Sequence, residues 1–327
     1  MAETLEKTVG NMINGRMVAI TGSIMLIFGV ADVLWLPHSN VSLDIGNFVE
    51  LAKVAGLLLM VYGLGKVVIL RLEHDATPIG RSIARAAECL LILARSVALF
   101  MPLAMLGAVF MYVASSTQAE LMDASLARID AALGFDWLVF LSLANSSKWL
   151  SMVLVVAYHS VGPQIPMVLV MLAVALREDL LLEFIALMSI ASLLTAIGLA
   201  LVPAAGAYAY FAPPAEMFAN FTRDAGMWHH SELMKLRSGE PFIYQMEKAK
   251  GLVTFPSYHT ALGIILTYAL REIRWIFVPV AILNSVMLVS TVPEGGHHLI
   301  DVLAGLAIAL ISIAIVRAAR RGVATHS

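Results

Sequence analysis

Long apolar runs separated by short polar segments dominate the chain. A helix that crosses a bilayer needs about 20 mostly apolar residues. Eight runs are candidates for such helices, at roughly residues 17–36, 48–70, 91–114, 149–176, 180–202, 257–270, 275–289 and 298–316. The fourth run contains a break at Gly162-Pro163 and Pro166. This pattern predicts an all-α integral membrane protein with about eight transmembrane helices.

Two weaker patterns lie between the third and fourth runs. Residues 118–135 place Leu121, Leu126, Ile129 and Leu133 at mostly helical spacing, with acidic residues on the other face. We therefore expect an amphipathic helix that lies on the outer membrane surface. The short apolar stretch 137–143 either begins the fourth span or forms a separate interfacial piece.

The distribution of Lys and Arg predicts the topology. With an even number of spans, both termini lie on one side of the membrane. The loops 37–47 and 290–297 contain no Lys or Arg. Positive residues gather instead on the side of the termini, at Lys7, Arg16, Arg71, Arg81, Arg85, Arg177, Arg271, Arg274, Arg317, Arg320 and Arg321. By the positive-inside rule the termini are cytoplasmic, in a plasma or inner membrane, and the long segment 203–256 faces outward.

Composition narrows the class of protein further. Of 327 residues, 60% are hydrophobic and only 13% are charged, about half the charge of a typical soluble domain. The net charge of −2 leaves no basic surface for a nucleic acid partner. The single cysteine, Cys89, excludes a disulfide framework and a zinc site built from cysteines.

The segment 204–255 carries an unusual density of aromatic residues. It holds nine of them, at Tyr208, Tyr210, Phe211, Phe218, Phe221, Trp228, Phe242, Tyr244 and Phe255. A solvated loop would not concentrate so many. The segment therefore either lies at the lipid–water boundary or forms a cap over a cavity shaped for a lipid.

One candidate for chemistry opens the sixth apolar run, at Pro256-Ser257-Tyr258-His259. Pro and Ser at the start of a helix are ordinary capping residues, so a capped helix with an interfacial histidine is one interpretation. The other is that the free N–H groups of this first turn bind an anion beside His259.

The second candidate opens the eighth run, where His297 and Asp301 are four residues apart and share one face of a helix. A carboxylate on one imidazole nitrogen sets the tautomer and makes the other nitrogen a better nucleophile. Gly295-Gly296 lets the backbone approach a ligand closely. The adjacent histidines His297 and His298 are also of the type that binds zinc. They lack the usual partner ligands, so we expect no metal.

Two further groups are less specific. Lys235 and Arg237 form a cationic cluster on the outer side, just before both histidine-bearing helix starts. Tyr158, His159 and Gln164 flank the break in the fourth run. We interpret these three as partners for backbone groups freed at a kink, with contact to a substrate as the alternative.

These residues together resemble the type-2 phosphatidic acid phosphatase superfamily. That family carries a P-S-x-H motif and a later S-R-x-x-x-x-x-H-x-x-x-D motif, to which Ser290, His297 and Asp301 correspond. The sequences around His259 and His297 are more narrowly similar to a branch that includes inositol phosphorylceramide synthases. The resemblance covers roughly residues 91–316 as a six-helix core.

The resemblance implies a role for each matching residue. The histidine at position 297 would attack phosphorus and form a phosphohistidine, oriented by Asp301. His259 would protonate the leaving group, Ser257 would bind phosphate oxygens, and no metal or other cofactor is needed. Two departures stand out: the motif arginine is Thr291, and the motif K-x-x-x-x-x-x-R-P is absent. Arg237 is the best substitute for the missing phosphate-binding cations, and the next candidates are Lys235, Lys248 and Lys250.

The sequence thus predicts a lipid phosphotransferase or phosphatase that acts on a phospholipid or sphingolipid at the extracytoplasmic face, with head-group transfer slightly favoured. A simple lipid-phosphate phosphatase and a non-catalytic lipid transporter or scaffold are the alternatives. We expect a two-helix addition with a cytoplasmic connector at 1–90, a catalytic core at 91–317 that includes the aromatic cap, and a basic cytoplasmic tail at 318–327.

Overall fold

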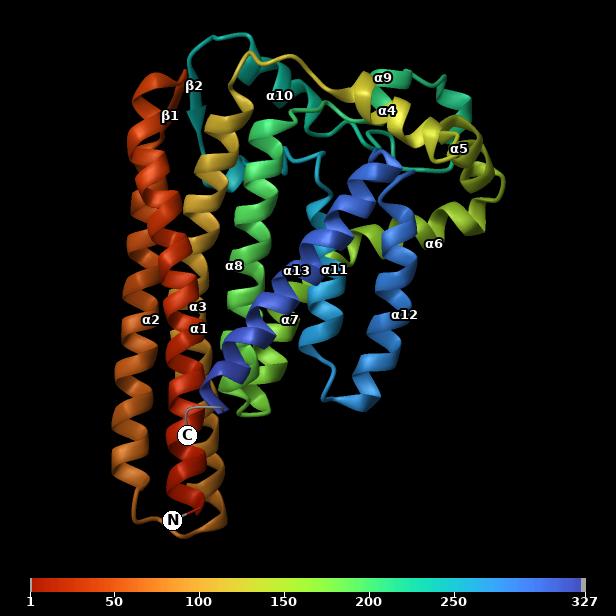
Figure 1. The fold of residues 1–327 in the computed structure, drawn as a ribbon. Helices are drawn as coiled ribbons and strands as arrows, with labels where there is room; N and C mark the ends of the chain where they lie inside the picture. Colours follow the sequence, from red (N-terminus) through yellow and green to blue (C-terminus); the bar gives the residue numbers. More distant parts are fainter. Residues whose placement is uncertain (1, 325–327) are drawn as a thin grey trace.

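The structure, a computed structural model that describes residues 2–324, is 76% helical. Five helices among the described residues are long and apolar enough to cross a membrane. They are α1 (Ala2–Trp35), α2 (Ile45–Leu72), α3 (Pro78–Ser115), α8 (Glu178–Leu201) and α13 (Leu299–Ala324), and α1, α2, α3 and α8 run side by side (Figure 1). The prediction of an all-α membrane protein is confirmed at this level.

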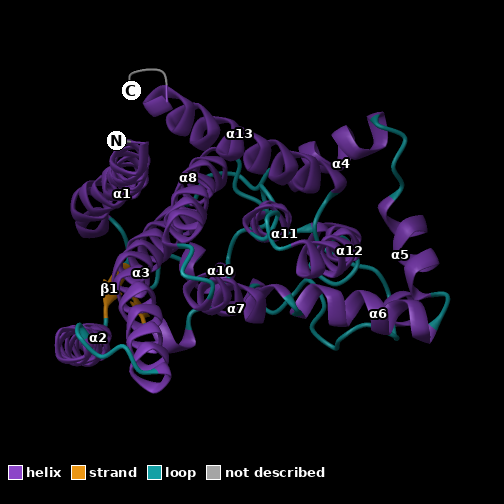
Figure 2. Cartoon of the chain, turned by 90° about the horizontal axis from the view of Figure 1, so that it is seen from below, coloured by secondary structure: helices purple, strands orange, loops and turns teal. Residues whose placement is uncertain are grey.

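The remaining apolar runs form shorter helices, so the predicted count of eight spans is not confirmed. Helices α11 (Tyr258–Ala269) and α12 (Arg274–Ser290) have 12 and 17 residues. At 1.5 Å per residue they reach about 18 and 26 Å, against a hydrocarbon thickness of about 30 Å. The predicted fourth span divides at Ser160 into α6 (Lys148–His159) and α7 (Val161–Val174), which follow one another along one side of the molecule (Figure 2). The stretch after residue 136 is a separate helix, α5 (Trp137–Asn145), bent by 108° from α6.

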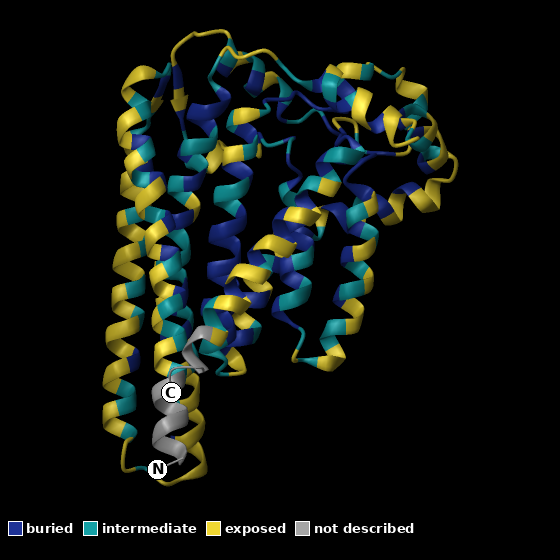
Figure 3. Ribbon diagram, viewed as in Figure 1, coloured by how far each residue is buried: buried dark blue, intermediate teal, exposed yellow. Residues whose placement is uncertain are grey.

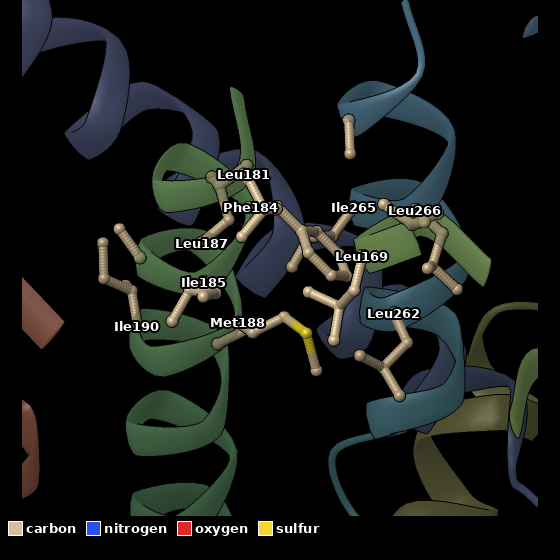
Figure 4. Packing of buried hydrophobic residues seen from close by; sticks show 14 of the residues in the cluster. Leu169, Leu181, Phe184, Ile185, Leu187, Met188, Ile190, Leu262, Ile265 and Leu266 are labelled. Atoms are coloured by element: carbon tan, nitrogen blue, oxygen red, sulfur yellow. The ribbon is translucent and has the colours of Figure 1, made fainter. Parts of the chain in front are cut away.

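Helix α8 is the centre of the bundle. It is apolar around its whole circumference, as a helix surrounded by other helices must be, and nearly all of its residues from Leu180 to Ala191 are buried. Phe184 and Met188 point toward Leu169 of α7 and Leu262 of α11 (Figure 4). By contrast, α2 packs mainly against α3 and is exposed along most of its length (Figure 3), as expected of a helix that faces lipid.

The first two helices are joined to the rest of the chain at one end of the bundle. After the short helix η1 (Leu36–His38), strand β1 (Val41–Leu43) pairs in parallel with β2 (Phe242–Tyr244). The Asn47 side chain also donates a hydrogen bond to the Tyr244 carbonyl, at 2.9 Å. The predicted division between residues 90 and 91 falls inside α3, which is continuous. The predicted tail begins within α13, and residues 325–327 lie outside the described part of the chain.

The opposite end of the bundle gathers the termini and many of the arginines. Arg16 of α1 donates a hydrogen bond to the carbonyl of Ala319 in α13, at 2.9 Å. Glu183 of α8 is buried and forms ion pairs with Arg271 and Arg320. Buried carboxylates require such partners, so this network joins α8, α13 and the turn between α11 and α12.

The segment 203–256 covers the other end with the short helices α9 (Ala207–Phe211), η2 (Ala215–Phe218), α10 (His230–Arg237) and η3 (Met246–Lys248) (Figure 1). Most of its aromatic residues build two small apolar cores. Tyr208, Phe211, Phe218 and Phe221 pack with Trp137 of α5. Phe242 and Tyr244 pack with Tyr112 of α3. The aromatic residues therefore attach a cap to the helices, which favours the second of the two interpretations made from the sequence.

Helix α4 (Asp123–Ala132) forms within the segment predicted to be amphipathic, but its acidic residues do not all face water. Asp123 and Asp130 are 5% and 2% exposed. Two of the acidic residues predicted to lie opposite the apolar face are therefore buried. The reason is that both carboxylates accept hydrogen bonds from backbone N–H groups of other segments.

Candidate active site

His297 and Asp301 meet at the start of α13, at the capped end of the bundle. The Nδ1 atom of His297 lies 3.3 Å from Asp301 Oδ2, and both side chains are buried. The spacing predicted that both residues lie on one face of a helix. The helix begins only at Leu299, so His297 lies in the loop before it. Instead the loop turns back, and the His298 N–H donates to the same Asp301 oxygen at 2.9 Å.

The two glycines before His297 make this turn possible. Gly296 has φ +73°, and a Cβ there would lie 2.7 Å from the Cα of Gly226 in the cap. A Cβ on Gly295 would lie 2.7 Å from the Tyr158 ring. Both glycines therefore allow close packing against other parts of the protein, and Gly295 also lines the cavity described below.

Helix α4 holds the other side of this loop. Asp130 accepts hydrogen bonds from the N–H groups of Leu299 and Ile300, each at 2.9 Å, and so caps α13. The ring nitrogens of His298 lie 3.7 Å from Asp123 and 3.5 Å from Asp130, distances at which the attraction is electrostatic. Burial alone would lower the pKa of His298, but the two carboxylates outweigh it and raise the pKa to about 9. We therefore regard His298 as a charged structural residue.

His259 lies opposite His297. It is the second residue of α11, and its ring stacks on Tyr158 with the centroids 4.6 Å apart. The ring centroids of His259 and His297 are 6.5 Å apart. Ser257, the predicted phosphate ligand, is fully buried and caps α11, where its hydroxyl accepts a hydrogen bond from Thr260 Oγ1 at 3.1 Å.

Both histidines line one cavity of about 530 Å³. Its polar end is formed by His159, His259, His297 and the loop around Lys250. Its apolar wall comes mainly from α3, through Phe100, Leu103, Ala104, Gly107, Ala108 and Met111. A cavity with a reactive polar end and a long apolar wall is suited to an amphiphilic molecule.

The cations predicted to bind phosphate lie in different places. Arg237 donates to the carbonyls of Thr117 and Ala119, so its guanidinium is engaged with backbone. The described residues that line the cavity include Lys250 but neither Arg237 nor Lys235. Lys235 and Lys248 line a separate pocket on the cap. His229 also reaches the cavity, but burial lowers its pKa to about 4, so it is uncharged there.

The structure adds residues that the motifs did not single out. Tyr158 and His159 line the cavity, whereas Gln164 pairs with Asn284 at 3.0 Å. His159 Nε2 lies 2.9 Å from a carboxylate oxygen of Glu294. The sequence indicated that the polar residues at the break in the fourth run have a role. Only the fold shows that Tyr158 and His159 line the cavity and that Gln164 joins two helices. In the described part of the chain, no group of three or more His, Cys, Asp or Glu side chains is arranged to hold a metal ion.

We predict that the charge on His298 stabilises the fold in a pH-dependent way. Because its pKa is raised in the folded state, its stabilisation is complete below about pH 6.5, its unfolded pKa, and is lost as the pH rises through about 9. At pH 6 in detergent, His298→Asn should have a lower melting temperature than the wild type, with a free energy of unfolding lower by no more than about 3 kcal/mol. The difference in melting temperature should shrink toward pH 9.5. The exposed His74→Asn serves as control, and a gap independent of pH would contradict the assignment.

Comparison with known proteins identifies the family of the chain. A family model described as the PAP2 superfamily matches residues 124–315, which is more than half of the chain. No curated protein and no solved structure matches it. The matched region contains His259, His297 and Asp301, and members of the superfamily are phosphatases. The chain therefore belongs to the PAP2 superfamily, as an integral membrane enzyme with phosphatase-type activity on lipid phosphates.

Proposed function

We propose that this protein transfers or hydrolyses the phosphoryl group of a lipid phosphate through a phosphohistidine on His297. The observation that carries the proposal is the pair of histidines, 6.5 Å apart between ring centroids, at the polar end of a cavity whose wall is apolar. One phosphorus centre fits between two such rings, since reacting atoms approach to about 3–3.5 Å.

The contacts of each histidine support a different role. Because Nδ1 of His297 faces Asp301, its Nε2 is the atom that attacks phosphorus. His259 has no carboxylate within hydrogen-bond distance among the described residues, and it lies across the cavity. Burial lowers the pKa of His259, and the negative charge of a bound phosphate would raise it again. His259 would then donate a proton to the departing oxygen and so avoid a free alkoxide.

Lys250 is the cation that we propose for the phosphate. Its Nζ donates to the Trp228 carbonyl at 2.8 Å, and the residue lines the cavity beside both histidines. Developing charge on the phosphoryl oxygens requires positioned donors. In this proposal Lys250 replaces Arg237, while Ser257 contributes by shaping the first turn of α11.

We further propose transfer of a head group to an alcohol, as in the inositol phosphorylceramide synthase branch, in preference to hydrolysis. The sequence similarity around His259 and His297 supports the branch. The missing motif arginines support it as well, since a phosphodiester carries less charge than a phosphomonoester and needs fewer cations. The substrate would then be a phospholipid or sphingolipid whose chains lie along α3. Phosphate release to water in an assay with excess alcohol would favour the simple phosphatase, and no turnover would favour a transporter or scaffold.

The site is proposed to face the extracytoplasmic side. It lies at the end of the bundle opposite the termini and the arginine network, where the loops 37–47 and 290–297 contain no Lys or Arg. This distribution supports cytoplasmic termini.

The roles of the three motif residues can be separated by leaving group. Replacing His297 with Ala should abolish turnover and remove any acid-labile phosphoenzyme. Asp301→Asn should keep the fold but cost several orders of magnitude in rate, as the loss of a tautomer-setting carboxylate can. His259→Ala should slow the expulsion of an alkoxide far more than that of an activated phenolate, which needs little protonation. Trapping of the labelled phosphoenzyme checks all three, and a phosphoenzyme that survives in His297→Ala would show the nucleophile to be wrong.

Lys250 and Arg237 should fail in different ways when each is replaced by Gln. Lys250→Gln should lower kcat/KM by about tenfold or more, because a charge-assisted contact to phosphate is worth about 1.5–3 kcal/mol, and should lower the melting temperature less than Arg237→Gln does, because the Lys250 side chain donates to one carbonyl, that of Trp228, and Arg237 donates to two. Arg237→Gln should lower the melting temperature, since the carbonyls of Thr117 and Ala119 lose their donor, with near-normal turnover. The reverse pattern would show that Arg237, and not Lys250, binds the phosphate.

The sidedness can be tested with single cysteines in a Cys89→Ala background. Glu240→Cys lies in the exposed turn between α10 and β2, and His74→Cys lies in the exposed turn between α2 and α3. An impermeant thiol reagent should label position 240 in intact cells and position 74 only after permeabilisation. The opposite result would place the site on the cytoplasmic face.

A further inference from the structure

A second histidine–carboxylate pair lies in the wall of the same cavity. His159, the last residue of α6, places Nε2 2.9 Å from Glu294 Oε1. Glu294 is three residues before His297 in the catalytic loop, while His159 comes from a distant part of the chain. We propose that His159, held by Glu294, is the general base that deprotonates the acceptor hydroxyl when the phosphohistidine is resolved. This inference rests on the function proposed above.

Glu294 is built into the protein as a fixed partner for His159. Its side chain is 0% exposed, and a buried carboxylate is costly unless hydrogen bonds satisfy it. The Thr222 hydroxyl donates to Oε1 at 2.6 Å, and the Thr222 N–H donates to Oε2 at 3.3 Å. The backbone of Glu294 is held too, since Gly226 N–H donates to its carbonyl at 2.8 Å. The cap thus orients this carboxylate toward α6.

The bond to Glu294 decides which nitrogen of His159 is available. When Nε2–H donates to the carboxylate, Nδ1 carries the lone pair. No residue in the described part of the chain forms a hydrogen bond with Nδ1. His159 lines the cavity, so Nδ1 is left as a proton acceptor for a molecule bound there.

Exposure separates His159 from the two motif histidines. The His159 side chain is 49% exposed, whereas that of His297 is 3% exposed. A base that takes a proton from an acceptor must release it again in every cycle, and in this proposal the exposed side of the His159 ring is where the proton leaves. The Trp228 ring, 5.5 Å from the His159 ring between centroids, forms the adjacent wall on which an acceptor molecule can lie.

In the proposed step, the bond formed to phosphorus replaces the bond that breaks. The acceptor O–H proton passes to Nδ1 of His159 while the acceptor oxygen bonds to phosphorus. The bond between phosphorus and Nε2 of His297 breaks, and its electron pair returns to Nε2. Asp301 stays paired with Nδ1 of His297 throughout. The imidazolium of His159 then gives its proton to water, which restores the starting state.

The test measures formation and decay of the phosphoenzyme separately in single turnovers in detergent micelles, with phosphatidylinositol and, in parallel, phosphatidic acid, each radiolabelled at phosphorus. In His159→Gln the phosphoenzyme should form at near the wild-type rate and decay about 100-fold more slowly, within the range that general bases contribute. Glu294→Gln should slow decay in the same direction, by about tenfold. The exposed His74→Gln should behave as wild type, and melting temperatures verify that each variant is folded.

Chemical rescue distinguishes a base from a structural residue. Pyridine attacks phosphorus without losing a proton, so it should restore fast decay in His159→Gln and should add little to the wild type. A His297-dependent phosphoenzyme that decays at the wild-type rate in folded His159→Gln, or in folded Glu294→Gln if the first variant does not fold, would overturn this proposal but leave the proposed function intact. Absence of any phosphoenzyme in the wild type would overturn both.

Discussion

The site depends on three buried carboxylates that hold the start of α13. Asp130 caps the helix through the N–H groups of Leu299 and Ile300, and Asp301 accepts from the N–H of His298 and faces the ring of His297. Asp123 completes the set by accepting from the N–H groups of Ala205 and Gly206 in the cap. The free N–H groups and the dipole at a helix N-terminus favour negative charge. The charged His298 offsets the cost of burying these carboxylates together.

This arrangement couples the cap to the chemistry. The loop that carries Glu294 and His297 packs against the cap through Gly226, and the cap is in turn attached by the aromatic cores around Trp137 and Tyr112. Trp137 also donates a hydrogen bond to the His297 carbonyl at 3.1 Å. His297, the proposed nucleophile, is therefore positioned from α4, α5 and the cap as well as from the start of α13. Such support is what keeps a reacting atom within the narrow geometry that transfer requires.

The cavity brings apolar and polar groups together in one space. Its apolar wall on α3 continues the hydrophobic environment of the bilayer, and its polar end presents His159, His259 and His297 from three separate elements. In the proposed function the apolar wall would stabilise the chains of a lipid, and the polar end would hold the phosphate and exchange protons. The addition of α1 and α2 packs behind α3 and pairs with the cap through β1 and β2, so it braces both the wall and the cap.

The sequence by itself determined the class of the protein and singled out His259 and His297 as candidate residues for the chemistry. Apolar runs of spanning length establish a helical membrane protein regardless of how the helices pack, because a bilayer imposes that length. The motifs around His259 and His297 are short stretches of sequence, so the chemistry that they suggest can be predicted without knowing the fold. Local pattern misled where burial decides: the acidic residues of α4 resemble a solvated face until Asp123 and Asp130 meet backbone N–H groups far along the chain. Likewise, only the fold brings His159 to Glu294 and Lys250 to the cavity while engaging Arg237 with backbone carbonyls. The contacts of His159 with Glu294 and of Arg237 with Thr117 join residues more than 100 positions apart, and no periodicity along the chain encodes which distant groups will share a cavity.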